Sequence, residues 1–400
     1  MTPPSLAARV RAALPAGVVR GLDRAISAVP DLRPPPAPMS PPDGARRLLV
    51  APANFAGQGW AWARAAERLD GVGARSMTYR GAAGFGFPSD YAVDTRTFLR
   101  SRAWQRTWFA TVSGRFTHVL VEAELPIFGR LFRGDVVREV AALRDAGVEV
   151  AMVAHGSDIR LPSRHRATEP DSPFAPGRYE GTDQLERSAA RNLDVLAQVG
   201  APVFVSTPDL LADAPGATWL PVVVGEGWLA RDAAPVLAGD RPLVVHIPSR
   251  AGLKGSAAIE PAMRRLHDEG LVRYERHEGV AADAMPELYR RADIVLDQFS
   301  LGSYGVAACE ALAAGRIVIG HVREDVREHV LGAGGGALPI VQSRAEDLDR
   351  VVRDLLADPA RARAAAAEGP RFVRAVHDGR RSAAVLGASF LADRSAAPPA

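Results

Sequence analysis

The chain contains very little lysine and very little cysteine. Of its 400 residues, 49 are lysine or arginine, and Lys254 is the only lysine. The single cysteine, Cys309, excludes an internal disulfide and a metal site built from several cysteines, and it is typical of a protein of the reducing cytoplasm. The sequence also lacks a run of about 18 apolar residues, so we expect no membrane-spanning helix.

Strong charge of either sign is absent as well. The formal net charge is +3, and the basic residues are mixed with acidic ones along the chain. No basic patch with interleaved aromatic residues is present, so nucleic acid is not an expected partner. Apolar residues make up 47% of the chain and charged residues 24%, which is typical of a soluble globular protein. A chain of this length suits two domains, each with its own core.

Residues 1–44 predict a basic helix followed by a Pro-rich linker. The stretch "SLAARVRAALPAGVVRGLDRAI" places apolar residues four apart, with arginines on the flanks. Because arginines interrupt it, the stretch lacks the continuous apolar region of a signal peptide. Two interpretations stay open for residues 5–27. The helix either lies on an anionic membrane surface, as a peripheral contact, or packs on its own domain.

From Arg47 onward, short Val-rich runs alternate with helical stretches. Runs such as "LLVAPA", "THVLVEAE" and "VEVAMVAHG" end in Gly, Pro or acidic residues, and the pattern restarts at "PLVVHIPS". This alternation predicts βαβ units around parallel sheets. We therefore expect an α/β fold with two doubly wound, Rossmann-like domains facing a cleft, at residues 45–227 and 228–370. Residues 371–400 are expected to form C-terminal helices that pack back on the N-terminal domain.

The lone lysine lies in a turn between a predicted strand and a predicted helix. In "LVVHIPSRAGLKGS", Gly255 lets the backbone approach a ligand closely, and Ser256 is a natural N-cap. The ligands of an open parallel sheet bind beyond the carboxyl ends of its strands, and a helix N-terminus favours an anion there. Lys254 and Arg250 would add positive charge. The turn therefore predicts an anion site.

A second Gly-rich turn follows within residues 292–320. A buried strand ends in Asp297 and Gln298, and a helix carrying Glu310 follows the turn. Such a turn offers backbone N–H groups to an anion or a sugar. Glu310 either accepts hydrogen bonds from vicinal hydroxyls or caps a neighbouring loop.

Three stretches of the first half are candidates for the opposite side of the cleft. "AHGSDIR" gathers His155, Asp158 and Arg160 at the end of a strand, and "PANFAGQGW" contains a weak glycine pattern. Glu122 and Glu124 end the strand "THVLVEAE", where alternation puts both on one face. They would line the cleft or cap the next helix. His246, inside an apolar strand, is expected to be a core residue.

Residues 246–320 carry a resemblance to a known family. "HIPSRAGLKGS" and "HEGVAADAMPELYRRADIVLDQFSLGSYGVAACEALAAGRIVIG" resemble the donor half of retaining glycosyltransferases of the two-domain GT-B architecture, nearest to family four. The resemblance implies that Lys254 and Arg250 hold a donor diphosphate, that Glu310 binds the ribose hydroxyls, and that the Gly279–Val280 turn lies against the base. It implies no metal and no cofactor beyond a UDP- or GDP-linked sugar as co-substrate.

The implied site residues fall into three groups. The expected catalytic residues are His155, Asp158, Lys254 and Arg250. The expected donor-binding residues are Ser249, Gly255, Val280, Asp297, Gln298, Ser303, Tyr304, Gly305 and Glu310. The expected acceptor-side residues are Asn54, Gly57, Gly59 and Arg160.

One position departs from the family pattern. The family commonly has two glutamates, the first of which contacts the donor sugar, and this chain has Gly302 in place of the first. Asp297 or Gln298 could supply the missing contact.

The resemblance implies a cytoplasmic, soluble or membrane-associated enzyme that transfers a sugar with retention to a glycan, lipid-linked or small-molecule acceptor. Two alternatives stay open: a nucleotide-sugar epimerase on the same architecture, and a non-catalytic nucleotide- or glycan-binding protein.

Overall fold

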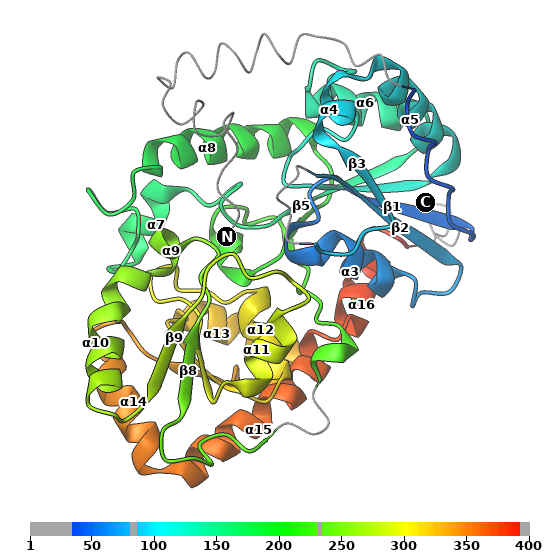
Figure 1. Cartoon of the computed structure of the whole chain (residues 1–400). Helices are drawn as coiled ribbons and strands as arrows, with labels where there is room; N and C mark the ends of the chain where they lie inside the picture. The colour runs from blue at the N-terminus through cyan, green and yellow to red at the C-terminus, as the bar shows by residue number, and fades with distance from the viewer. Residues whose placement is uncertain (1–33, 81–85, 230–233, 393–400) are drawn as a thin grey trace.

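The structure is a computed structural model, and it describes residues 34–80, 86–229 and 234–392 (Figure 1). The predicted basic helix and the membrane contact proposed for residues 5–27 lie outside the described residues. The described chain forms two lobes, each built around one sheet, and the chain crosses between the lobes near residues 220–229 and again near His377.

The first sheet has seven parallel strands in the order β3-β2-β1-β4-β5-β6-β7. Its strands are β1 (Arg46–Ala51), β2 (Val72–Arg80), β3 (Tyr91–Asp94), β4 (His118–Glu122), β5 (Glu149–Ala154), β6 (Val203–Val205) and β7 (Thr218–Trp219). The second sheet has five parallel strands in the order β12-β11-β10-β8-β9. They are β8 (Leu243–His246), β9 (Arg273–Arg276), β10 (Ile294–Leu296), β11 (Ile317–Gly320) and β12 (Ile340–Gln342).

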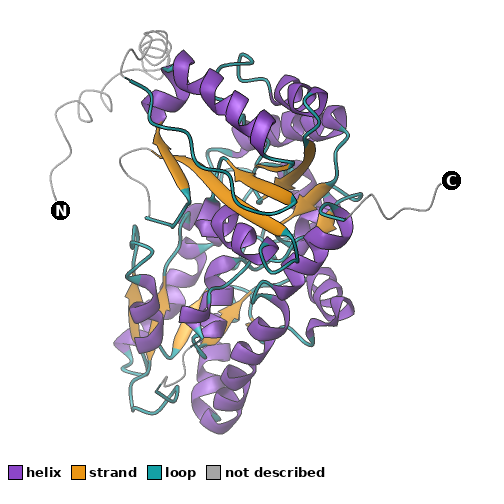
Figure 2. Ribbon diagram, turned by 90° about the vertical axis from the view of Figure 1, so that its right-hand side faces the viewer, coloured by secondary structure: helices purple, strands orange, loops and turns teal. Residues whose placement is uncertain are grey.

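Helices cover both faces of each sheet (Figure 2). In the first lobe they are α3 (Gln58–Ala66), α4 (Thr95–Arg100), α5 (Arg102–Arg115), α6 (Val136–Asp145), α7 (Pro162–Thr168) and α8 (Thr182–Val199), with the short 3₁₀ helices η1 (Phe55–Gly57), η2 (Pro208–Ala212) and η3 (Glu226–Trp228). In the second they are α9 (Ala251–Lys254), α10 (Ser256–Asp268), α11 (Met285–Arg291), α12 (Val306–Ala313), α13 (Glu324–Val330), α14 (Leu348–Ala357) and α15 (Pro359–Val376). The final helix, α16 (Arg380–Ser389), belongs to the second half of the chain.

Strand alternation explains why both faces of the first sheet are apolar. Leu48 and Val50 of β1 pack in one buried cluster with Trp62 of α3 and Leu386 of α16. Leu49, the residue between them, belongs to the cluster on the other face. Fully buried parallel strands need such continuous apolar runs. Two Rossmann-like α/β domains, the predicted fold class, are confirmed.

The C-terminal helices tie the two lobes together. Helix α15 runs through Pro370 without a break, although the sequence suggested that a new helical region begins after that residue. Its Gly369 approaches α12 so closely that a Cβ would come within 2.6 Å of the Leu312 carbonyl oxygen. Beyond His377, α16 packs against α3 of the first lobe (Figure 1).

Candidate functional site

The lone lysine lies at a junction between two loops of the second domain. Its ammonium nitrogen is 2.8 Å from Asp297 Oδ1, and the two side chains are 16% and 4% exposed. The N–H of Phe299 donates to the Lys254 carbonyl oxygen. Gly255 has a φ of 76°, and a Cβ there would lie 2.4 Å from Ser300 Oγ. The turn after β8 and the turn after β10 are therefore locked together, with the ammonium group between them.

The sequence suggested that Ser256 caps α10, and this prediction is wrong. Gly255 is the N-cap, and the Ser256 hydroxyl is 2.7 Å from Nε2 of His246. His246 is fully buried and donates from Nδ1 to the Leu296 carbonyl oxygen, so Nε2 accepts from Ser256. Burial lowers the pKa of His246 to about 4. The predicted core histidine therefore takes the hydroxyl that would otherwise cap the helix.

Glu310 lies on α12, and its carboxyl group makes no hydrogen bond with any described residue. Burial raises its pKa to about 8, and the positive charge of Lys254 opposes that rise. A carboxyl group kept free beside an ammonium can accept hydrogen bonds from the hydroxyls of a ligand.

The remaining predicted donor residues differ in burial and in the contacts that they make. Arg250 is exposed, and its Nη1 donates to Ser157 Oγ of the first domain over 3.3 Å. Ser249 is exposed, Val280 is half-buried, and Gly305 is the N-cap of α12. Gln298, which is buried, donates to the Ser303 carbonyl oxygen.

Gly302, the position that departs from the family pattern, is closed over by other side chains. It has a φ of 63°, and a Cβ there would lie 2.6 Å from Cγ of Arg323 and 3.0 Å from a carboxylate oxygen of Glu169. A glutamate at 302 would need both neighbours to move.

In the first domain, the turn after β1 is filled by a carboxylate. Glu122 is fully buried and accepts from the N–H groups of Ala53 and Asn54. Its Oε1 is 3.2 Å from Nε2 of His155. The predicted residue Asn54 uses its own side chain inside the turn, because its amide donates to the Pro88 carbonyl oxygen and its oxygen accepts from the N–H of Trp60.

The two glycines of this turn are also packed. Gly59 lies against the Glu122 carboxylate, at 2.9 Å from a notional Cβ, and Gly57 has a φ of 74° next to Phe87. Between them and Asn54, the ring of Phe55 is half exposed and stands edge-on to His155, with ring centroids 5.2 Å apart.

Glu124 does not share a face with Glu122, because β4 ends at Glu122. Ala123 and Glu124 both take positive φ values, of 55° and 52°, so strand alternation stops there. The oxygens of Glu124 are buried and contact no polar group among the described residues. Burial, with the nearby charge of Asp158, raises the pKa of Glu124 well above its usual value.

Two predicted site residues of the loop after β5, Asp158 and Arg160, make hydrogen bonds within the first domain. The Asp158 carboxylate accepts from the backbone N–H groups of His155 and Gly156, at 2.7 and 2.5 Å. Arg160 is buried and donates from Nε and Nη2 to Asp209, which follows β6. Asp209 in turn accepts from Ser303 of the second domain.

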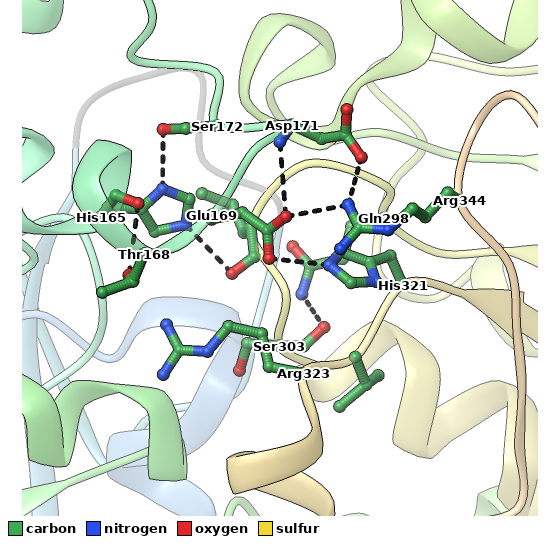
Figure 3. A network of polar contacts seen from close by, with 12 residues as sticks. His165, Thr168, Glu169, Asp171, Ser172, Gln298, Ser303, His321, Arg323 and Arg344 are labelled. Atoms are coloured by element: carbon green, nitrogen blue, oxygen red, sulfur yellow. Dashed lines mark hydrogen bonds and ion pairs between the residues drawn. The ribbon is translucent and has the colours of Figure 1, made fainter.

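A polar pocket of about 600 Å³ lies between the two domains (Figure 3). The residues that line it follow the carboxyl ends of strands in both sheets. They are Arg160, Arg164, His165, Thr168, Glu169, Asp209, Ala212, Asp213, His321, Val322, Arg323, Glu324, Asp325, Gln342 and Arg344. Apart from Arg160, the sequence pointed to none of these residues.

Glu169 is the centre of the contacts around this pocket. It accepts from His321 Nε2 at 2.8 Å and from Arg344 Nη1 at 3.1 Å, both of the second domain (Figure 3). Its burial would raise its pKa, but His321 and Arg344 lower the pKa to about 2. Arg344 also contacts Asp171. The segment after α7 is thus bound to the opposite domain by charge-assisted hydrogen bonds.

Among the described residues, no helix combines the length and the hydrophobicity that a membrane span needs. Within the same ranges, no three His, Cys, Asp or Glu side chains gather as a metal site requires.

The fold and the cleft define a class of architecture, and solved structures share it. Anabaena HepE in complex with UDP and glucose matches with a TM-score of 0.53 at 10% identity, over 86% of this chain and 99% of that chain. The sucrose-phosphate synthase of Thermosynechococcus elongatus matches with a TM-score of 0.52 at 14% identity, over 86% and 98%. The chain has the GT-B fold, in which two Rossmann-like domains face each other.

Sequence comparisons find similarity to glycosyltransferases. Residues 241–387 match a family model described as glycosyl transferase-like. The D-inositol 3-phosphate glycosyltransferase of Rhodococcus opacus (strain B4) is 31% identical over 222 residues, which are 52% of this chain and 45% of that protein. The match therefore spans less than half the length of this curated relative.

Proposed function

We propose that the chain is a glycosyltransferase that transfers a hexosyl group from a UDP- or GDP-linked sugar to an acceptor hydroxyl, with retention of configuration. The observation that carries this proposal is the group formed by Lys254, Asp297 and Glu310. Asp297 Oδ1 lies 2.8 Å from the Lys254 ammonium nitrogen. The side chain of Glu310 has no hydrogen-bond partner among the described residues. A fixed cation beside a free carboxyl group suits a nucleoside diphosphate, which offers phosphate oxygens and ribose hydroxyls.

The domain of residues 228–370 would take the donor in this proposal. As the bond to the sugar breaks, negative charge gathers on the leaving diphosphate, and a preorganised cation stabilises that state more than the ground state. In this proposal Lys254, Arg250 and the N–H groups of the turn before α12 would do this without a metal. One such contact is typically worth about 2.7–4 kcal/mol of transition-state stabilisation.

Retention follows if the leaving phosphate accepts the acceptor's proton on the face that it leaves. His155 and Asp158 would hold the donor sugar from the first domain. The buried thiol of Cys309 fits a reducing compartment such as the cytoplasm.

The acceptor would occupy the interdomain pocket. Its volume of about 600 Å³ suits a small sugar or the end of a glycan or lipid-linked glycan. Arg164 and Arg323 line it and keep N–H groups that contact no described residue. Because the relative in Rhodococcus opacus is named for inositol 3-phosphate, polyol phosphates are the first acceptors to test.

Nucleotide binding to a Lys254→Ala variant tests the proposal. We expect UDP or GDP to bind the native chain in calorimetry and the variant to bind at least about 100-fold more weakly, with Lys254→Arg in between. Arg265→Ala, on the outer side of α10, is the matched control, since that guanidinium is 60% exposed. Equal affinity in native chain and Lys254→Ala variant would refute the lysine's role. Binding without transfer to any acceptor would favour a binding protein.

A further inference from the structure

The turn that leads into α12 is held by side chains from outside its own domain. Residues 301–305 form this turn, called the donor turn below. His165 Nε2 donates to the carbonyl oxygen of Leu301 over 3.2 Å, and Ser303 Oγ lies 2.5 Å from Asp209 Oδ1. Both partners belong to the first domain, His165 to α7 and Asp209 to η2. Within its own domain, the Gln298 side chain donates to the Ser303 carbonyl oxygen of the donor turn.

Asp209 is held in position for its hydrogen bond with Ser303. It is 5% exposed, and Arg160 donates to its Oδ2 from both Nε and Nη2. Burial alone would raise the pKa of Asp209, but the charge of Arg160 and the hydrogen bond from Ser303 lower it overall. The carboxylate therefore stays ionised and accepts, so the hydroxyl of Ser303 must donate to it. The contact has one direction and one geometry.

His165 has an equally fixed role. A carbonyl oxygen only accepts, so Nε2 carries the proton and Nδ1 accepts from Ser172 Oγ at 2.7 Å. Burial lowers the pKa of this histidine, which keeps it neutral. The backbone of the donor turn is thereby fastened to α7 at Leu301, two residues before Asp209 fastens it at Ser303.

A third contact lies where the chain crosses between the domains. Tyr304 is buried, and its hydroxyl is 3.3 Å from Nε2 of His377. His377 donates from Nδ1 over 2.8 Å to the carbonyl oxygen of Val222, which lies in the other segment that crosses between the domains. Tyr304 is thereby attached to the segments that cross between the domains, whereas Leu301 and Ser303 are attached to the first domain.

The donor turn carries backbone donors that point to a use for this arrangement. The N–H groups of Tyr304 and Gly305 make no hydrogen bond with any described residue, and α12 begins directly after them. We infer that Asp209 and His165 are positioning residues, which set these N–H groups against the donor diphosphate only while the two domains are together. The inference rests on the proposed function, because it takes the diphosphate to bind at this turn.

Such an arrangement makes donor binding depend on the first domain. A nucleotide that needs the ordered turn must also favour the apposed domains, and the two events then stabilise each other. Neither Asp209 nor His165 has to touch the nucleotide.

A change at Ser303 tests this with the least damage. We expect Ser303→Ala to weaken UDP or GDP binding about tenfold, while Ser303→Thr, which keeps the hydroxyl, restores most of the affinity. The matched control is Ser382→Ala, since Ser382 is fully buried and its hydroxyl donates to the Pro221 carbonyl oxygen. Melting temperatures should fall by similar amounts in the two alanine variants, whereas only the Ser303 variant should lose nucleotide affinity.

A double variant identifies the partner. If Asp209 acts through Ser303, Asp209→Asn in a Ser303→Ala background should weaken nucleotide binding little further. Where Asp209→Asn fails to fold, the comparison of Ser303→Ala with Ser303→Thr decides alone. Nucleotide affinity unchanged in Ser303→Ala, with Lys254→Ala still impaired, would overturn this inference and leave the proposed function standing. Absence of nucleotide binding in the native chain would overturn both.

Discussion

The turns after β1 and β8 occupy the same place in their two sheets, but the charged side chain at the first is a carboxylate and the one at the second is an ammonium group. After β1, the fully buried Glu122 accepts the backbone N–H groups of Ala53 and Asn54. After β8, no carboxylate takes the N–H groups of Ser249 and Arg250 among the described residues, and Lys254 lies at the end of the turn. A turn whose donors already bind a carboxylate cannot receive a phosphate. The comparison therefore supports the proposal that the anion binds to the second domain.

Removal of Glu122 is the strongest way to break this comparison. We expect Glu122→Ala to lower the free energy of unfolding by about 3 kcal/mol, since two buried N–H groups lose their acceptor. Glu122→Gln, which keeps one acceptor oxygen, should cost less. Denaturant unfolding measures both, with Glu287→Ala as a control at a residue that is 64% exposed.

Nucleotide affinity of the same variants separates the two turns. The folded Glu122 variants should bind UDP or GDP as the native chain does, because the anion binds elsewhere. Tighter binding after the carboxylate is removed would mean that the first turn also receives phosphate, and the contrast between the domains would be lost.

The sequence predicted most of the fold, because parallel strands that are buried on both faces leave continuous Val-rich runs. Strand β3 escaped prediction. It has only four residues, lies at the edge of the sheet and pairs with β2 alone, so its pattern is too short to stand out. The helix cap at Ser256 was wrong for a different reason, since a buried histidine ten residues earlier takes the hydroxyl.

The site was predictable only in part. Strand ends and glycine-rich turns mark Lys254 and Glu310 in the sequence, because each lies within one local pattern. Glu169, Asp209 and Arg344 carry no such mark. Their contacts arise when loops from two domains meet, over separations in the chain of 94 to 175 residues. Local periodicity does not encode that meeting.

The buried histidine beside the lysine turn gives a pH dependence that sharpens the comparison. The pKa of His246 is lowered to about 4 in the folded chain, against about 6.5 when unfolded. The unfolded state therefore binds a proton first as the pH falls, and stability is lost between pH 6.5 and 4. By pH 4.5 this histidine should account for about 2–3 kcal/mol of lost stability.

The measurement is the free energy of unfolding at pH 7 and pH 4.5 in native chain and His246→Gln. Glutamine fills part of the same space and does not titrate, so the variant should lose less stability over this interval. Equal losses in the two proteins would show that His246 does not stay neutral in the folded chain.

The smallest expected effect concerns Glu310, the carboxyl group whose pKa is influenced by Lys254. With a pKa of about 8, Glu310 is largely protonated at pH 7 and becomes a carboxylate above pH 8. A carboxylate accepts hydrogen bonds from ribose hydroxyls more strongly than the neutral acid does. The preference for UDP over deoxy-UDP, or for GDP over deoxy-GDP, should rise severalfold between pH 7 and pH 9 in the native chain. Glu310→Gln should show a smaller preference that does not change with pH. Since both nucleotides carry the same diphosphate, their ratio cancels the effect of pH on the phosphates. A pH-dependent preference that persists in Glu310→Gln would remove the residue from the ribose site.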